Sequence, residues 1–230
     1  MSSKTLTSKF GYFGKVPDIG DYIQSGVTVE FTDIWSEWLQ SVLAVSKEQL
    51  SNRWLETFLT SPVWHFSLSP GLCGDKTVIG TMMPSIDQVG RHYFFTTIRE
   101  VEMSPYYYWK NRVWSEKAES HLLKLFDDNN SLEDWLSVFS NNDWLVEQDF
   151  DISEPRIVAK NPKGIVLEDI SELSEDVLVH YLLELSFGNY CIWWTSGSKS
   201  VEQCKVVTSG LPFVGQFSAM LDGEWENWGW

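Results

Sequence analysis

Apolar side chains recur along the chain with two different periods, which predict helices and strands in alternation. Between residues 31 and 43 the large apolar residues lie three and four positions apart, as on one face of a helix, and Thr28 or Thr32 is placed to cap its start. A second stretch of this kind covers residues 50–59 and ends before Pro62. Further helices are predicted over residues 109–126, 132–139, 177–185 and 217–221.

Short apolar runs bounded by glycine, proline or polar residues predict strands over residues 10–14, 63–68, 77–83, 92–98, 191–195 and 204–208. The runs between residues 63 and 98 are apolar enough for both faces of their sheet to be covered. Residues 141–175 are acidic and weakly patterned, and we expect a loop with a short edge strand there. Ser131, followed by Asp134, resembles a capping box at the start of the helix over 132–139.

This alternation favours a single α/β domain over residues 1–230, with a mixed α+β sheet between helices on both sides. Residues 1–9 and the last few residues are expected to be less ordered than the rest unless they dock on the domain.

Charge and cysteine usage narrow the class of protein. The net charge is −15, and nearly all of it lies beyond residue 110. Such a surface repels nucleic acid and anionic membranes, and it serves either solubility or the steering of a basic partner. The 3 cysteines form no close pair. With no apolar leader and no apolar run near the ~20 residues that span a bilayer, we expect a cytoplasmic protein without membrane insertion.

Sequence signatures of catalysis and of cofactor binding are missing. The chain has no Gly-rich nucleotide motif, no G-x-S-x-G elbow and no C-x-x-C pair, and its 4 histidines are scattered. We therefore predict no cofactor, no metal and no enzymatic activity.

Two polar segments are candidate sites. Asp18 and Asp21 lie in a glycine-containing turn, where a carboxylate pair suits a metal or acid–base chemistry but more commonly bonds the turn backbone. Ser85, Asp87 and His92 would be the parts of a nucleophilic site if they converged. The favoured alternative is a structured turn in which Asp87 pairs with Arg91.

The C-terminal tail alternates acidic residues with indoles, among them Trp225 and Trp228. Such indoles suit a partner groove with basic rims, or they fold back to close the edge of the core.

Five segments, in order, resemble the type VI secretion-associated TagF family, also called ImpM. They are residues 10–23 (Phe-Gly-Tyr-Phe-Gly-Lys-Val-Pro-Asp-Ile-Gly-Asp-Tyr-Ile), 35–40, 61–74, 83–94 (Met-Pro-Ser-Ile-Asp-Gln-Val-Gly-Arg-His-Tyr-Phe), and 191–197 followed by Gly210-Leu-Pro. Tyr22 stands where the family usually has Phe. His92 and Phe95 depart from the Tyr-Phe-Pro that usually follows the arginine.

The resemblance implies a three-layer αβα sandwich and a post-translational repressor of type VI secretion that binds the forkhead-associated scaffold protein of the system. Some relatives carry a PP2C-like phosphatase domain, which no part of this chain resembles. For partner binding we select Asp21, Asp87, Arg91, Trp225 and Trp228. The alternatives are a hydrolase that uses Ser85, Asp87 and His92, or a structural accessory subunit of the secretion apparatus.

Overall fold

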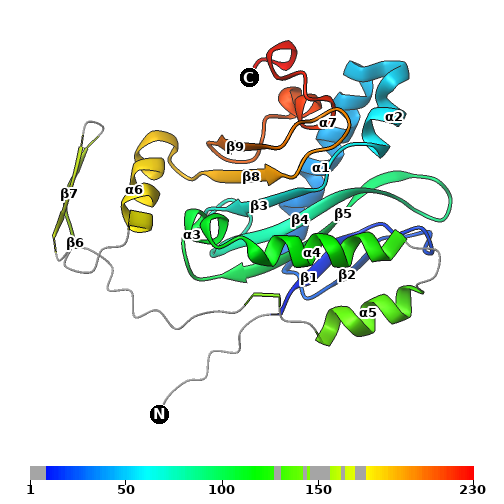
Figure 1. The fold of residues 1–230 in the computed structure, drawn as a ribbon, viewed down its shortest axis with the longest axis horizontal. Helices are drawn as coiled ribbons and strands as arrows, with labels where there is room; N and C mark the ends of the chain where they lie inside the picture. The colour runs from blue at the N-terminus through cyan, green and yellow to red at the C-terminus, as the bar shows by residue number, and fades with distance from the viewer. Residues whose placement is uncertain (1–8, 127–130, 142–143, 146–155, 162–163, 169–174) are drawn as a thin grey trace.

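A sheet of antiparallel strands forms the centre of the computed structural model, which describes residues 9–126, 131–141, 144–145, 156–161, 164–168 and 175–230. Within these residues the sheet has seven strands in the order β2-β1-β5-β4-β3-β8-β9 (Figure 1). Their bounds are β1 Gly11–Gly14, β2 Ile23–Ser25, β3 Trp64–Leu68, β4 Thr77–Ile86, β5 His92–Val101, β8 Cys191–Thr195 and β9 Cys204–Thr208.

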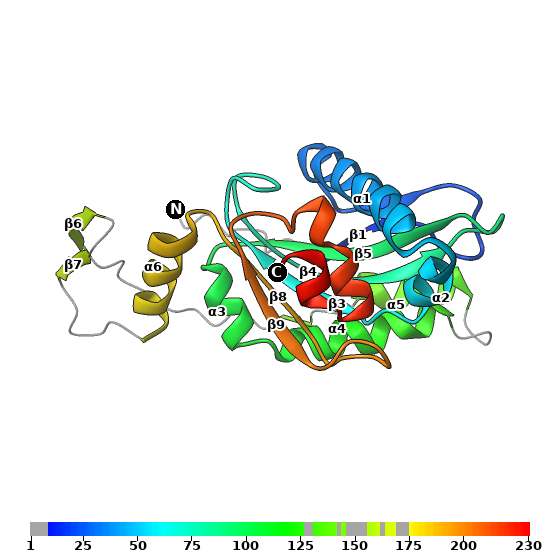
Figure 2. The same ribbon diagram turned by 90° about the horizontal axis from the view of Figure 1, so that it is seen from above.

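Helices cover both faces of this sheet. The helices are α1 Val29–Leu50, α2 Trp54–Leu59, α3 Pro105–Lys110, α4 Val113–Leu123, α5 Leu132–Asn141, α6 Glu175–Phe187 and α7 Ser218–Asp222. Buried side chains of α1, α2 and α7 share one apolar core with the sheet, and those of α3, α4 and α5 share a second core. Figure 2 shows α1 on one side of the strands and α4 and α5 on the other. The predicted α/β class and three-layer αβα sandwich are confirmed.

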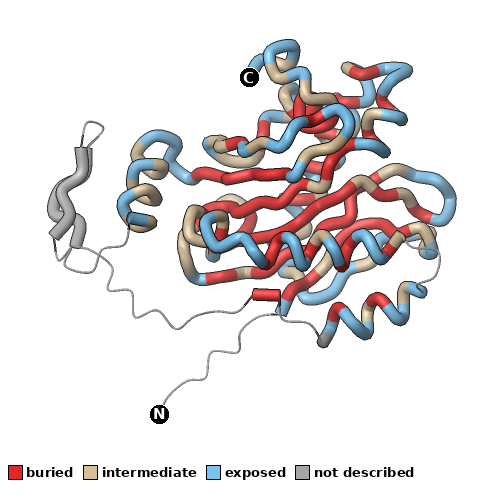
Figure 3. The backbone as a smooth tube through the Cα atoms, in the orientation of Figure 1, coloured by how far each residue is buried: buried red, intermediate tan, exposed pale blue. Residues whose placement is uncertain are grey.

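The strands are buried because alternate side chains enter the two cores. Trp64 and Phe66 of β3 lie in the core beneath α1, as does Trp193 of β8, whereas the adjacent Trp194 lies in the core beneath α4. This period of two is the one that the strand pleat imposes. Figure 3 shows the resulting band of buried backbone through the middle of the sheet.

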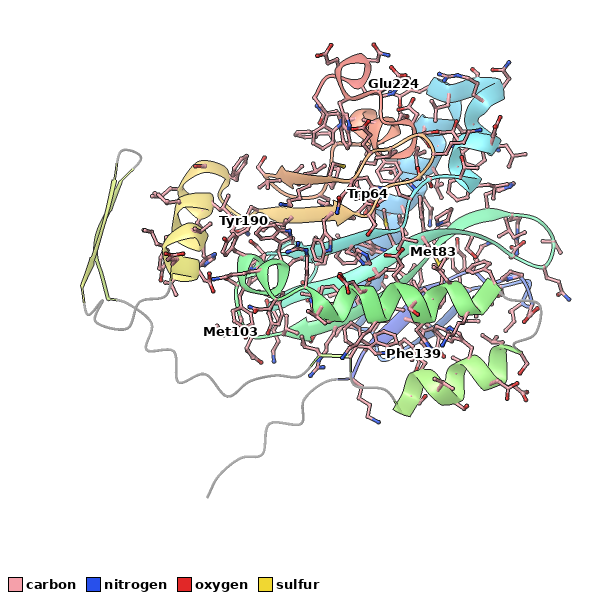
Figure 4. The ribbon with its side chains drawn as sticks, viewed as in Figure 1. Trp64, Met83, Met103, Phe139, Tyr190 and Glu224 are labelled. Atoms are coloured by element: carbon pink, nitrogen blue, oxygen red, sulfur yellow. The ribbon has the colours of Figure 1, made fainter. Side chains whose placement is uncertain are left out.

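Several buried indole N–H groups hold elements together through hydrogen bonds. Trp35 Nε1 donates to Thr96 Oγ1 over 3.1 Å, which fixes α1 on the sheet. Trp64, labelled in Figure 4, donates from Nε1 to the carbonyl oxygen of Met220 over 3.0 Å, which fixes the C-terminal segment. A satisfied N–H lets a large ring be buried without a polar penalty.

Three predicted details are wrong. Every pairing in the seven-stranded sheet is antiparallel rather than mixed. Four of these pairings join strands that follow one another with no helix between them, namely β1–β2, β3–β4, β4–β5 and β8–β9. The helix predicted over 109–126 is two helices, because Asn111 ends α3 by donating from its side chain to the Tyr107 carbonyl oxygen over 3.0 Å. In place of a loop with one edge strand, residues 141–175 contain β6 Arg156–Asn161 and β7 Gly164–Glu168, paired as a separate two-stranded sheet.

Other expectations are confirmed. Thr28 caps α1, and Ser131 exchanges capping hydrogen bonds with Asp134. Residues 1–8, part of the expected disordered N-terminus, lie outside the described residues.

Two glycines of the N-terminal segment lie where neighbouring backbone leaves no room for a side chain. A Cβ on Gly14, whose φ is +143°, would lie 2.3 Å from the carbonyl oxygen of Phe94 in β5. A Cβ on Gly11 would lie 2.2 Å from the carbonyl oxygen of Gly26. These glycines therefore allow β1 to fit between β2 and β5.

We predict that Gly14→Ala lowers the free energy of unfolding by about 2–4 kcal/mol, through overpacking and an unfavourable φ. Urea unfolding measures the loss. Gly20→Ala is the matched control, because its Cβ would meet nothing nearer than Gln88 Oε1 at 3.8 Å. Equal losses in the two variants would contradict this account of β1.

Candidate partner-binding site

The N-terminal turn and the β4–β5 hairpin, far apart in sequence, meet at one end of the sheet. The turn follows directly from β1, which pairs with β5 through Gly14 and Phe95. The backbone N–H of Gln88 in the hairpin donates to the carbonyl oxygen of Ile19 in the turn over 3.2 Å. The two most distinctive motifs of the sequence thus form one structure.

The carboxylate of Asp87 joins the two segments. It accepts hydrogen bonds from Lys15 Nζ over 2.8 Å and from Arg91 Nε over 2.6 Å. Backbone N–H groups of Val89 and Arg91 donate to its other oxygen over 3.1 and 2.8 Å. The Asp87 side chain has no exposed surface, and that of Lys15 is 6% exposed. A buried charge is tolerated only when it is paired and hydrogen-bonded in this manner.

The pKa of Asp87 reflects two opposing influences. Burial raises it, because the charged form loses its hydration. Hydrogen bonds from Lys15 and from the backbone and side chain of Arg91, together with the Lys15 charge, outweigh burial and hold the pKa well below its usual range. Asp87 is therefore ionised at neutral pH.

The same network positions the residues around it. Arg91 Nη2 donates to the carbonyl oxygen of Gly20, so the guanidinium spans from the hairpin to the turn. Ser85 Oγ donates to the carbonyl oxygen of Lys15 over 2.6 Å. The Lys15 ammonium also lies 4.8 Å from the centre of the Tyr22 ring, which stacks on Phe13.

What reaches solvent here is a small surface of mixed chemistry. Arg91 exposes 58% of its side chain, Tyr22 is 41% exposed and Val89 is 69% exposed. Asp21 is exposed, and its carboxylate accepts from the backbone N–H of Tyr22 over 2.8 Å. We call Asp21, Tyr22, Val89 and Arg91 the hairpin surface. It combines apolar, aromatic and charged groups on a backbone that the Asp87 network holds in place.

Comparisons with known proteins agree with the motifs. A family model described as the TagF N-terminal domain, type VI secretion system-associated, matches residues 11–141, more than half of the chain. The chain belongs to the TagF family. The crystal structure of PA0076 from Pseudomonas aeruginosa PAO1, at 2.05 Å resolution, matches with a TM-score of 0.77 and 27% sequence identity over 94% of this chain and 95% of that one. No curated protein matches significantly.

Within this TagF domain the predicted site residues separate into buried and exposed groups. Asp21 and Arg91 both lie on the hairpin surface. Asp87, which we had selected for partner contact, is 2% exposed and cannot itself touch a partner. The carboxylate can be buried because two cations and two backbone N–H groups donate hydrogen bonds to its oxygens. Asp87 instead positions Arg91.

The catalytic alternative is not assembled in the TagF domain. Ser85 Oγ is bonded to backbone oxygens, and Asp87 is saturated by Lys15 and Arg91. His92 lies edge-on to the rings of Trp54 and Phe58, with centroids 5.3 and 5.8 Å away. Among the described residues, no hydrogen bond links His92 to Ser85 or to Asp87. These residues therefore lack the arrangement that activates a nucleophile.

The C-terminal indoles pack on their own domain. Trp225 and Trp228 are partly buried against the core beneath α1 and α7. The ring of Trp225 meets Trp64 edge-on, and Trp228 Nε1 donates to the carboxylate of Asp222 over 3.1 Å. The tail thus closes the core edge, which is the second of the two interpretations offered from sequence.

Two residues with definite contacts were not singled out from sequence. Lys15 follows Gly14 in the first motif. Its charge directly after an apolar strand is the feature of the sequence that could have drawn attention to it. His65 is 2% exposed, and its ring nitrogens contact Thr81 Oγ1 at 2.8 Å and Glu119 Oε2 at 3.0 Å. No local sequence pattern predicts these contacts.

In the described part of the chain, no three His, Cys, Asp or Glu side chains gather into a group that could hold a metal ion. In the same residues no helix has the length and apolar character needed to cross a bilayer.

We predict that Asp87→Asn lowers the thermal midpoint at pH 7 by several degrees, because Lys15 and Arg91 lose their buried counter-ion. The folded pKa of Asp87 lies below the unfolded value of about 3.9, so the ionised group adds stability above that pH. This stability is lost as the pH falls through the lower folded pKa. The gap between wild type and variant should therefore narrow in acid.

Thermal unfolding of both proteins from pH 7 down to the lowest pH at which they fold measures this gap. Asp21→Asn alters an exposed carboxylate that has no hydrogen bond to Lys15, Asp87 or Arg91 among the described residues. It serves as control and should change the midpoint little at any pH. A gap that stays constant across the series would contradict the assigned role of the Asp87 charge.

Proposed function

We propose that this TagF family member is a cytoplasmic repressor of type VI secretion that acts by binding the forkhead-associated scaffold protein of the system. The binding would use the hairpin surface, with no covalent chemistry. The alternatives of a hydrolase and of a structural subunit find less support in the site.

The main support is the rigid, exposed hairpin surface. The Asp87 network fixes the turn and the hairpin before any partner arrives, so little conformational entropy is lost on binding. Its exposed groups include a tyrosine and an arginine, two residue types enriched at binding hot spots. The lack of an assembled nucleophile among Ser85, Asp87 and His92 is consistent with a binding role.

Long-range charge would assist encounter rather than supply contacts. The net charge is −15, most of it beyond residue 110. A field of this sign accelerates association with a basic partner and weakens with added salt.

The test is binding of the purified scaffold protein from the same bacterium to wild-type and Val89→Glu proteins, measured by calorimetry. Val89 is 69% exposed in the hairpin, so a charge there should spoil an apolar contact without unfolding the domain. We expect a loss of affinity of at least about tenfold, because one buried charge costs more than about 1.4 kcal/mol in an interface.

Val113→Glu is the matched control. This valine is 64% exposed at the start of α4, on another part of the molecule. It should leave binding unchanged. In the native cell, Val89→Glu should also raise secretion of a type VI substrate into the medium. Absence of binding by the wild-type protein would overturn the proposed function, and equal binding by both variants would remove the hairpin surface from it.

A further inference from the structure

A hollow of about 400 Å³ lies beside the hairpin surface, between α1, the start of α2 and the start of β5. Three basic side chains line it, namely Lys47 from α1 and Arg91 and His92 from the hairpin. Its apolar lining includes Leu43 and Trp54, and none of its lining residues is acidic. We call it the basic hollow. All of its lining residues come from the first 110 residues, which carry little of the net charge of −15.

The basic side chains of this hollow have hydrogen-bond donors that no described residue uses. Lys47 is exposed, and its ammonium lies 5.1 Å from the centre of the Trp54 ring. In the described part of the chain this ammonium has neither an ion pair nor a hydrogen bond. Arg91 uses Nε and Nη2 on Asp87 and Gly20, while Nη1 has no described acceptor. The ring nitrogens of His92 likewise have none among the described residues.

The charge of Asp87 does not cancel these bases. That carboxylate is buried and shared between Lys15 and Arg91, so the three groups together carry one net positive charge. Lys47 adds a second. Burial and the nearby charge of Lys47 lower the pKa of His92, while Asp87 raises it, and the net pKa is lowered. At neutral pH the ring is therefore uncharged and offers one N–H donor.

We propose that the basic hollow receives an oxyanion group, a carboxylate or a phosphate, carried by a side chain of the partner protein. This inference rests on the proposed function and deepens it. Lys47, Arg91 and His92 would donate to the oxyanion, and Leu43 and Trp54 would contact the stem that carries it. Arg91 is held by Asp87 and by Gly20, so one donor is already in position when the group arrives.

The first experiment uses small anions as probes. Sodium phosphate and sodium acetate are titrated separately, at constant ionic strength, into wild-type protein while the imidazole signals are followed by NMR. The His92 signal is assigned with His92→Gln. We expect saturable shifts of that signal and a rise in the His92 pKa, because an anion in the hollow favours the charged ring.

Lys47→Met tests the assignment, since methionine retains a stem that can pack on Trp54 and removes only the charge. It should weaken anion binding at least about tenfold, the loss expected for one charged hydrogen bond. Lys199→Met, an exposed lysine in the β8–β9 loop, is the control for net charge and should bind as wild type does.

The second experiment uses the scaffold protein, native and after phosphatase treatment. Lys47→Met should lower its affinity at least about tenfold relative to Lys199→Met. If phosphatase treatment lowers wild-type binding to the level of Lys47→Met, the oxyanion is a phosphate; if it changes nothing, the oxyanion is a carboxylate.

The two hypotheses fail differently. A wild-type protein that does not bind the scaffold overturns the proposed function. Scaffold binding that Lys47→Met leaves intact, together with anion titrations that do not move the His92 signal, overturns the basic hollow while the proposed function stands.

Discussion

The arrangement of the N-terminal turn and the β4–β5 hairpin at one end of the sheet depends on one buried carboxylate. Asp87 accepts hydrogen bonds from Lys15, directly after β1, and from Arg91 in the β4–β5 hairpin, and so joins two segments that are far apart in the sequence. Removing a charge from water is costly, and only the close fit of two cations and two backbone donors makes it favourable. The network therefore specifies one mutual arrangement of turn and hairpin.

This constraint explains why polar residues concentrate there without forming a nucleophilic arrangement of Ser85, Asp87 and His92. Ser85 and Asp87 are committed to internal hydrogen bonds, and His92 lies against aromatic rings. What remains available to other molecules is the rim of the network, which consists of the hairpin surface and the basic hollow. The two adjoin at Arg91, whose guanidinium belongs to both.

Periodicity predicted most of the fold because burial in this sheet follows the pleat. Trp193 and Trp194 enter different cores because neighbouring strand residues point to opposite faces, and this alternation can be read from the local sequence. At the break between α3 and α4, the backbone of Asn111 leaves helical angles and its side chain donates to the Tyr107 carbonyl oxygen, which no periodic pattern reveals. The role of Asp87 was half predictable, since its pairing with Arg91 is local, whereas its burial depends on Lys15, which lies 72 positions away.

Hydrogen–deuterium exchange can show whether Asp87 couples the turn to the hairpin. Exchange is compared between wild type and Asp87→Asn under conditions in which both are folded, with the amides of β3 and β8 as internal reference. If Asp87 couples them, residues 15–22 and 86–92 lose protection together in the variant while the reference amides keep theirs. Loss of protection in the hairpin alone, with the turn unchanged, would contradict it.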